Sequence, residues 1–287
     1  MIKYRQYNNL DSSYVLNKIK IFLEEDIPDG DQTSLGIITS SDYITAEIQV
    51  VEKLIFSGKQ VIRHCFDNAD VIINVSDGDE LMPGDVIGKI CGSAKHVLSR
   101  ERIMLNLIQR LCGIASNVKE YTDLAKPFGV KILDTRKTTP GLRLFEKYAV
   151  TCGGGFNHRL NLSEGILIKD NHIKAAGSIK KAIESVRKKS KLLPIELEVD
   201  NISQIYEGLK MGVDGFLLDN MDPLKVIESL SIIRSFSNKK FFVEASGGIT
   251  LNNIIGYLET KVDAISIGAL THQIKSKDIR LEFIDLI

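Results

Sequence analysis

The sequence has no excess of charge of either sign. Its 287 residues include 37 Lys and Arg and 37 Asp and Glu, so the formal net charge is zero. A domain dedicated to nucleic-acid binding is expected to be strongly basic, and the composition therefore argues against nucleic acid as a partner. A chain of this length can form one large domain or two of modest size.

A long hydrophobic run is also missing. No segment approaches the ~18 consecutive apolar residues that indicate a membrane-spanning helix. The first residues, MIKYRQYNNLDSS, have no apolar core of the kind found in signal peptides. We therefore expect no membrane span and no membrane partner, and the expected location is the cytoplasm.

Cysteine is scarce, and it lacks the spacing of common cysteine motifs. Cys65, Cys91, Cys112 and Cys152 show no paired C-x-x-C spacing and lie in apolar or glycine-flanked contexts. Buried free thiols in a reducing cytoplasm are the simplest interpretation. The adjacent His64 and Cys65 do not indicate a zinc site, because neighbouring side chains on a regular element point in different directions.

The first part of the chain mixes helical and strand-like patterns. Apolar periodicity predicts helices over residues 13–25 and 59–66, and strands over 44–51, 71–75 and 86–90. A long helical pattern then runs from residue 96 to about 125, with an interruption expected at Gly113. These patterns predict an N-terminal α/β sandwich domain over residues 1–115.

The second part changes to a regular alternation of strands and helices. The predicted strands are 131–133, 166–168, 195–199, 215–218, 241–245 and 264–267, and the helices between them are 178–187, 203–211, 223–234 and 251–259. Such alternation indicates a parallel sheet with crossover helices. A full eight-unit barrel takes ~250 residues, so residues 116–287 predict a shortened parallel α/β barrel of about six or seven strands. The final residues are free to pack on the first domain.

Five basic residues gather in the segment 134–173, next to glycines and to predicted strand ends: Arg136, Lys137, His158, Arg159 and Lys169. Arginine holds a carboxylate or a phosphate with two parallel hydrogen bonds. A solvated basic surface is the alternative interpretation. The position of the charges at strand ends, rather than along a helix face, favours an anion-binding site.

Nearly every predicted strand of the second part ends in a polar residue or glycine. In a parallel barrel the loops that leave the carboxyl ends of the strands meet at one mouth, where ligands bind. Ser246-Gly247-Gly248 and Ser266 with Gly268 follow the last two strands, where barrels often bind phosphate through backbone amides. Turns also need glycine, but this position favours a phosphate site.

An ordered series of motifs resembles the quinolinate phosphoribosyltransferase family over nearly the whole chain. In chain order the motifs are EDIPDGDQT (25–33), ERIMLN (101–106), CGIAS (112–116), the basic segment 134–173, IELEV (195–199), LDNM (218–221), EASGGI (244–249) and IGALTH (267–272). The resemblance implies the same two-part architecture. It also implies that quinolinate and phosphoribosyl pyrophosphate react to give nicotinate mononucleotide, pyrophosphate and CO₂ in NAD biosynthesis.

The resemblance further assigns roles to the basic residues. It implies that Arg136, His158, Arg159 and Lys169 hold the two carboxylates of quinolinate, while Lys137 favours pyrophosphate. Lys53, Arg102 and His272 would complete the pyrophosphate side or close the site. The alternatives are a solvated Lys53 and a capping or packing role for His272.

Two acids complete the expected site. Glu196 and Glu198 lie on one face of their strand by period-two alternation, and a buried acid is costly without a partner. By the resemblance, Glu198 and Asp219 would bind ribose hydroxyls, support Mg²⁺ through water and stabilise a developing ribosyl cation. The alternative is that both only neutralise nearby cations. Glu196 is expected to serve structure by pairing.

The complete set of candidate site residues is Lys53, Arg102, Thr135, Arg136, Lys137, His158, Arg159, Lys169, Glu198, Asp219, Ser246, Gly247, Gly248, Ser266, Gly268 and His272. Of these, Lys137, Glu198 and Asp219 are expected to be catalytic. By the resemblance, Arg102 from one subunit reaches the site of its neighbour, which predicts a homodimer or a larger homo-oligomer with shared sites. Local pairing of Arg102 with Glu101 is the alternative.

Two other functions fit parts of the sequence. The segments 26–31 and 35–37 also resemble the molybdenum-transport-associated homologues of the family, although the basic segment favours the quinolinate enzymes. Cys112 stands where serine is usual, and Phe56-Ser57-Gly58 also departs from the common pattern. A non-catalytic barrel that senses phosphate or a nucleotide is the second alternative. The acid pair beside the basic cluster argues against it.

Overall fold

The computed structural model describes residues 2–39 and 42–286, and its contacts divide the chain into two compact units. The first, called the sandwich unit below, comprises Tyr7–Lys119, Leu144–Gly154 and the residues from Gln273 on. The second, called the barrel unit, comprises the residues up to Gln6, Glu120–Arg143 and Gly155–His272. Each unit is therefore assembled from segments that lie far apart in the sequence.

The sandwich unit contains an antiparallel sheet of four strands in the order β12-β1-β5-β3, and β2 pairs separately with β4. The strands are β1 (Tyr43–Val50), β2 (Leu54–Ile55), β3 (Asp70–Ile73), β4 (Glu80–Leu81), β5 (Val86–Ser93) and β12 (Ile279–Leu286). The helices are α1 (Ser12–Asp26), α2 (Gln32–Ile37), α3 (Lys59–Cys65), most of α4 (Ala94–Ala125) and most of α5 (Arg143–Cys152).

Strand β1 lies at the centre of this sheet, because it pairs with β12 on one side and with β5 on the other. Its alternating pattern places Ile44, Ala46, Ile48 and Val50 in the core. This is the half-buried strand that the sequence predicts. Its partner β12 lies more than 200 residues further along the chain and is not among the predicted strands, although apolar and charged residues alternate over its first half.

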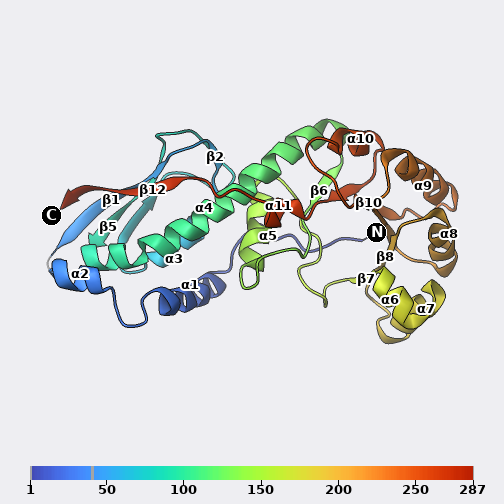
Figure 1. Cartoon of the computed structure of the whole chain (residues 1–287), viewed down its shortest axis with the longest axis horizontal. Helices are drawn as coiled ribbons and strands as arrows, with labels where there is room; N and C mark the ends of the chain where they lie inside the picture. Colours follow the sequence, from blue (N-terminus) through green and yellow to red (C-terminus); the bar gives the residue numbers. More distant parts are fainter. Residues whose placement is uncertain (1, 40–41, 287) are drawn as a thin grey trace. The chain divides into compact units, whose positions relative to one another are not determined.

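The barrel unit contains six parallel strands in the order β6-β11-β10-β9-β8-β7. They are β6 (Lys131–Leu133), β7 (Ile166–Ile168), β8 (Ile195–Val199), β9 (Gly215–Asp219), β10 (Phe242–Ser246) and β11 (Ala264–Ser266). The intervening helices are α6 (Asp170–Ala176), α7 (Ile179–Lys189), α8 (Ile202–Met211), α9 (Pro223–Ser235) and α10 (Ile254–Glu259), with η1 (Lys126–Phe128) before β6 and α11 (Ala269–His272) after β11. Figure 1 shows α7, α8 and α9 in a row along the outer side of these strands. The predicted fold class, with six strands in the shortened barrel, is confirmed.

Two helices, α5 and α6, lie in segments for which the sequence pattern predicts no helix. Helix α5 occupies part of the segment between β6 and β7, and α6 begins directly after Lys169. Helix α5 is short, and its buried residues include the charged Glu146 and Lys147, which a sequence pattern would assign to the surface.

Helix α4 is continuous through Gly113, and the predicted interruption is therefore wrong. The reason for a glycine is packing, because the backbone of Lys275 and Ser276 crosses the helix at this point. A Cβ atom on Gly113 would lie 2.4 Å from the carbonyl oxygen of Lys275. Gly113 therefore allows the backbone of Lys275 to pack closely against α4, and it does not break the helix.

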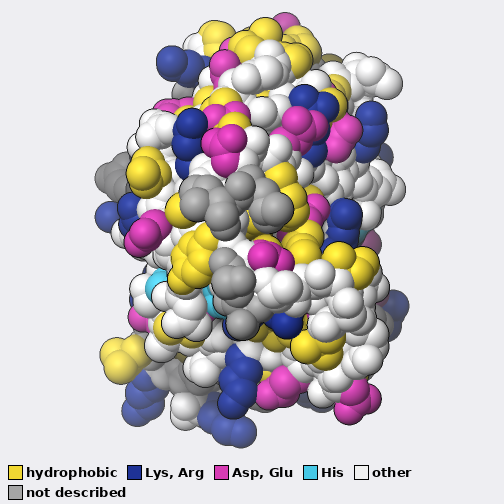
Figure 2. Space-filling model, turned by 90° about the vertical axis from the view of Figure 1, so that its left-hand side faces the viewer, with side chains coloured by type: hydrophobic (Ala, Val, Ile, Leu, Met, Phe, Trp, Pro, Cys, Tyr) yellow, Lys and Arg dark blue, Asp and Glu magenta, His cyan; other side chains and the backbone are white. Residues whose placement is uncertain are grey.

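The surface shows no large area of one charge on the face that Figure 2 presents. This face is the side of Figure 1 that carries α2 and the end of β12, and basic, acidic and hydrophobic side chains are interspersed on it. Among the described residues, no helix combines the length and the hydrophobicity needed to cross a membrane.

Gly113→Ala tests the crossing of α4 by the backbone of Lys275. Alanine favours a helix over glycine by ~1 kcal/mol, but a clash with backbone typically costs about 1–3 kcal/mol. We expect a lower free energy of unfolding in urea for Gly113→Ala. Gly36→Ala in α2 is the matched control, since no atom lies within 4 Å of its added Cβ, and this variant should be equally or more stable than wild type. A Gly113→Ala variant as stable as wild type would contradict the close approach.

Candidate active site

The candidate residues of the barrel unit lie at one edge of its sheet. Thr135, Arg136 and Lys137 follow β6, and Lys169 follows β7. Glu198 is the penultimate residue of β8, and Asp219, Ser246 and Ser266 end β9, β10 and β11. All six strands are parallel and in register, with Ser246 beside both Asp219 and Ser266. The carboxyl ends of the strands therefore form a single mouth, as expected for a parallel α/β barrel.

An acid–cation pair occupies the β7–β8 side of this mouth. Lys169 Nζ lies 2.7 Å from Glu198 Oε2, and both side chains are partly exposed. Burial raises the pKa of Asp219 on the next strand, against the opposing charges of Lys169 and Lys137. Asn220 Nδ2 also donates to Asp219 Oδ2 at 2.8 Å. Two acids and two lysines therefore act on one another across β7, β8 and β9.

Lys137 is held against the loop that follows β11. Its backbone carbonyl accepts a hydrogen bond from Thr271 Oγ1 at 2.7 Å, and its own amide donates to Thr135 Oγ1 at 3.0 Å. A Cβ on Gly268 would lie 2.8 Å from Lys137 Cδ and 3.1 Å from His272 Nε2. Glycine at this position therefore lets the lysine stem and the histidine ring approach the backbone.

Gly247 meets the loop after β9 in a similar way. Its φ of 94° lies in the region that favours glycine, and a Cβ there would lie 2.2 Å from Asn220 Oδ1. The Asn220 amide donates to the carbonyl of Ser246 at 2.9 Å. Gly248, with φ of 62°, continues the turn. Glycine is therefore required at position 247 because a side chain there would clash with Asn220. The pair Gly247-Gly248 also leaves two backbone positions at the mouth without side chains.

Two arginines lie close together beside this edge. Arg159 is 5% exposed and donates from Nη1 to the carbonyl oxygen of Gly165 at 2.7 Å. Burial lowers the pKa of Arg159, and the neighbouring Arg136 cation lowers it further, while Tyr4 and nearby glutamates oppose the change. Arg136 Nε is buried and has no hydrogen-bond partner among the described residues. Two guanidinium groups in this arrangement favour a bound anion.

His158 directly precedes Arg159 in the chain and lies in a buried cluster with two acids. Its Nε2 atom lies 3.3 Å from Glu196 Oε2 and 3.4 Å from Glu244 Oε1. Both carboxyl groups are fully buried, and His158 is 5% exposed. Tyr4 donates its hydroxyl to Glu196 at 2.7 Å, and Ser266 Oγ donates to Glu244 at 3.1 Å. The cluster therefore belongs to the interior of the barrel, below the mouth.

The hydrogen bonds indicate where the protons of this cluster lie. Two adjacent buried carboxylates do not both ionise readily, and burial together with the Glu196 carboxylate raises the pKa of Glu244. Burial by itself would lower the pKa of His158, but Glu244 and Glu196 raise it to about 10. A second ring proton would sit on Nδ1, which already accepts the amide of Arg159 at 2.9 Å. This bond favours a neutral His158 with its proton on Nε2, and the raised pKa of Glu244 favours a protonated carboxyl group there.

His158, Glu196 and Glu244 are also the residue types that bind transition metals, and their ligand atoms lie within 4.8 Å of one another. Tyr4 and Ser266 each donate a hydrogen bond to one of the two carboxyl groups. The contacts therefore fit a buried hydrogen-bond network.

The remaining candidates, Lys53 and Arg102, belong to the sandwich unit. Lys53 Nζ lies 3.1 Å from Glu80 Oε2 in an exposed pair. Arg102 is exposed on α4, and its charge opposes the burial that raises the pKa of Glu101. The exposed Lys53 agrees with the solvated alternative, and Arg102 lies near enough to Glu101 to act on its pKa.

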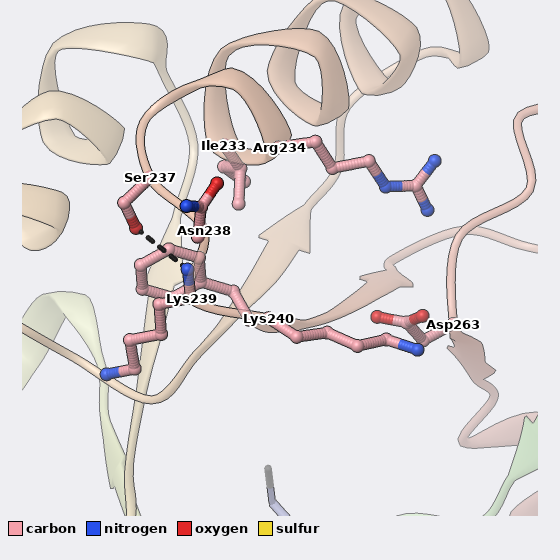
Figure 3. Close-up of a pocket in the computed structure, with 8 residues that line it drawn as sticks. Ile233, Arg234, Ser237, Asn238, Lys239, Lys240 and Asp263 are labelled. Atoms are coloured by element: carbon pink, nitrogen blue, oxygen red, sulfur yellow. Dashed lines mark hydrogen bonds between the residues drawn. The ribbon is translucent and has the colours of Figure 1, made fainter.

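A surface pocket of about 460 Å³ lies at the other edge of the sheet. It is formed between the end of α9 and the starts of β10 and β11, and Figure 3 shows the side chain of Lys240 reaching toward Asp263 there. Lys239 Nζ donates to the carbonyl of Val213 at 2.7 Å. The pocket lies at the amino ends of the strands, so it is separate from the candidate site.

Three residues of the buried cluster were missing from the predicted set. The sequence assigns Glu196 to structure, includes Glu244 only in a motif at a functional-looking strand end, and gives no role to Tyr4. An acid inside an apolar strand is a usable signal, because a buried acid requires a partner. Tyr4 gives no such signal, since it lies 192 positions from Glu196.

Comparisons with known proteins identify related chains. Residues 31–112 match the family model described as quinolinate phosphoribosyl transferase, N-terminal domain, and residues 114–282 match that of the C-terminal domain. A Bacillus subtilis protein named "Probable nicotinate-nucleotide pyrophosphorylase (carboxylating)" is 41% identical over 280 residues, which cover 96% of this chain and 94% of the relative.

Two further relatives extend the comparison. A Nicotiana tabacum protein named "Quinolinate phosphoribosyltransferase (decarboxylating) 1b" is 37% identical over 284 residues, covering 92% of this chain and 81% of its own. The solved structure of the nicotinate-nucleotide pyrophosphorylase from Francisella tularensis superimposes with a TM-score of 0.91 at 34% identity. That match covers 98% of this chain and 100% of the solved one.

The proton assignment predicts different outcomes for two isosteric substitutions. Glu244→Gln should change the free energy of unfolding by less than about 1 kcal/mol, because an amide replaces a protonated carboxyl group. Glu196→Gln should cost about 1.5–3 kcal/mol, because Tyr4 and His158 would lose a charged acceptor. Urea unfolding of both variants measures the difference. A larger loss for Glu244→Gln than for Glu196→Gln would place the charge on the other acid.

Proposed function

Because the chain belongs to the quinolinate phosphoribosyl transferase family, we propose that it transfers the phosphoribosyl group of phosphoribosyl pyrophosphate to quinolinate. The products are nicotinate mononucleotide, pyrophosphate and CO₂, and the reaction is a step of NAD biosynthesis. The names of the relatives support this proposal. The observation that carries it is the meeting of Arg136, Arg159 and Lys169 with two acids at one mouth.

Quinolinate would bind to the cations on the β6–β7 side. It carries two adjacent carboxylates, and the paired guanidinium groups of Arg136 and Arg159 suit planar carboxylates better than a point charge does. Lys169 would supply the third cation. His158 was expected to hold a carboxylate directly, and its ring nitrogens face Arg159 and the two buried acids. We therefore assign it mainly to the support of Arg159.

The phosphate groups would bind on the β9–β11 side. Of the glycines at this side, Gly248 leaves its backbone open to a phosphate, since no atom lies within 4 Å of its added Cβ, which suits the 5-phosphate of the ribose. Lys137 and His272 lie together beside Gly268, and we assign them to the pyrophosphate. Ser246 would contribute to the 5-phosphate side, whereas Ser266 is buried against Glu244 and supports the sheet.

The chemistry requires no covalent intermediate with the protein. The ring nitrogen of quinolinate attacks the anomeric carbon as the bond to pyrophosphate breaks. Glu198 and Asp219 would stabilise the positive charge that develops on the ribose, as carboxylates do for oxocarbenium ions. The bond from the ring to the adjacent carboxylate then breaks and CO₂ leaves. The electron pair remains on the ring carbon, where a proton from solvent is taken up.

We also propose Mg²⁺ as the cofactor. Glu198 and Asp219 lie on neighbouring strands, are partly exposed and offer the oxygen ligands that this ion prefers. One oxygen of Glu198 is already paired with Lys169, so the fit is best through water and substrate oxygens. The ion would neutralise part of the charge of the pyrophosphate.

Release of CO₂ from quinolinate labelled at the 2-carboxylate tests the function. Purified protein with phosphoribosyl pyrophosphate and Mg²⁺ should release label, and omission of either substrate should stop the release. A molybdenum-transport-associated homologue or a non-catalytic sensor would release none. Absence of release under these conditions would therefore reject the proposal.

Arg136→Ala and Arg159→Ala should each weaken quinolinate binding more than binding of phosphoribosyl pyrophosphate. A lost hydrogen bond to a charged group costs about 1.5–3 kcal/mol, which is roughly one to two decades in affinity. Calorimetry with each substrate measures this. Arg234→Ala is the matched control, because Arg234 contacts the carbonyl of Lys261 at the opposite edge of the sheet. Unchanged quinolinate affinity in both site variants would remove them from the site.

We further propose a cytoplasmic homodimer with shared active sites. The four cysteines are free, which suits a reducing compartment. Arg102 is exposed on the sandwich unit, and we propose that it serves the site of the neighbouring subunit. In a two-fold dimer each site would then draw residues from both copies. We assign Lys53, which pairs with Glu80, to the pyrophosphate side of the site together with Arg102.

Hybrid dimers test the sharing of sites. Arg102→Ala and Lys137→Ala should each be nearly inactive alone. When the two variants are unfolded and refolded together, half of the dimers are mixed and each mixed dimer has one intact site, so roughly a quarter of wild-type activity should return. Mass spectrometry verifies the mixing. Mixed dimers without recovered activity would place Arg102 in its own subunit's site or outside the chemistry.

A further inference from the structure

The N-terminal segment, residues 2–6, is part of the barrel unit although most of that unit begins more than 100 residues later. Ile2 is buried in a cluster with Leu133, Phe242 and Ala264, and Tyr4 packs against this cluster. Gly215 makes room for it, since a Cβ there would lie 2.7 Å from Ile2 Cδ1. Figure 1 shows the segment entering the region of β8 and β10. It is therefore anchored among the amino ends of the strands.

Tyr4 follows this buried end of the segment and contacts residues that surround Arg159. Its hydroxyl donates to Glu196 Oε2 at 2.7 Å, and its ring stacks on the His158 ring with centroids 4.3 Å apart and planes 29° apart. The ring also covers Gly165, where a Cβ would lie 2.9 Å from Tyr4 Cε1. The carbonyl of Gly165 is the acceptor for Arg159 Nη1. The Tyr4 side chain thus contacts Glu196 and the ring of His158. It also contacts Gly165, whose carbonyl oxygen accepts the hydrogen bond from the Arg159 guanidinium group.

Gln6 holds the backbone just before His158. The Asn157 amide donates to Gln6 Oε1 at 2.8 Å, and Gln6 Nε2 donates to the Asn157 carbonyl at 3.0 Å. On the other side, Asp134 accepts hydrogen bonds from Asn157 Nδ2 and the His158 amide at 2.7 and 2.8 Å. The segment and Asp134 therefore fix residues 157–159 from two directions.

We propose that Tyr4 is a positioning residue for quinolinate binding: through Glu196, His158 and Gly165 it holds Arg159 in the orientation that receives a carboxylate. This inference rests on the proposed function. Binding of a planar anion by two guanidinium groups depends on their geometry, and a residue held by packing and hydrogen bonds loses less freedom when the ligand binds. Phosphoribosyl pyrophosphate would bind to Lys137 and the glycine loops, which Tyr4 does not contact. The effect should therefore be confined to one substrate.

Steady-state kinetics of Tyr4→Phe and Tyr4→Leu test this role. Tyr4→Phe removes the hydrogen bond to Glu196 and keeps the stacked ring. It should raise the KM for quinolinate about fivefold, the equivalent of one hydrogen bond, and leave the KM for phosphoribosyl pyrophosphate within about twofold. Tyr4→Leu also removes the stacking and should raise the quinolinate KM further. Tyr206→Phe is the matched control, because Tyr206 is exposed on α8, and it should match wild type.

The two KM values distinguish positioning from a general contribution to stability. An unchanged quinolinate KM, or an equal rise in both KM values, would overturn the proposal. Gly165→Ala provides an independent variant should Tyr4→Phe not fold, because its added Cβ displaces the Tyr4 ring; it should show the same selective rise. Wild-type protein measured in parallel separates the two hypotheses. An inactive wild type would reject the function and the inference together, whereas an active wild type with unchanged variants would reject the inference alone.

Discussion

The six strands of the barrel unit run in the same direction, and the placement of its functional side chains depends on this constraint. In a parallel sheet all carboxyl ends meet at one edge. Residues from Asp134 to His272, more than 130 positions apart, can therefore meet at one mouth. The register adds precision, because Ser246 pairs with Asp219 on one side and with Ser266 on the other. A slip by one residue would turn the acids of β8 to the opposite face.

The barrel interior balances charge in two layers. Glu196 and Glu244 lie fully buried below the mouth, and an isolated charge there would be costly. Hydrogen bonds from Tyr4 and Ser266, the His158 ring 3.3 Å from Glu196, and a protonated Glu244 reduce this cost. Next to this layer Arg136 and Arg159 lie close together, and Arg136 Nε is buried without a hydrogen-bond partner among the described residues. The layer of acids stabilises the fold, and the arginine pair is suited to an anionic ligand.

Local patterns predicted most elements because they depend on near neighbours in the sequence. The six strands of the barrel, the crossover helices and the long helix α4 all follow from periodicity. The prediction failed where distant segments decide the structure. Gly113 is needed for the backbone at Lys275 and does not interrupt α4. Strand β12 pairs with β1, which lies more than 200 residues earlier in the chain, and α5 buries the charged Glu146 and Lys147.

By itself the sequence determined the α/β class, the parallel order of the second half and the gathering of cations and acids at strand ends. Chain direction and side-chain period are local properties, and they suffice for this. Only the tertiary structure decided which residues contact one another. It joined Tyr4 to Glu196 and His158, turned Ser266 toward Glu244 and brought Gly268 against Lys137. These contacts link positions far apart in the chain, and they form only when packing and hydrogen bonding close the barrel around buried acids that require partners.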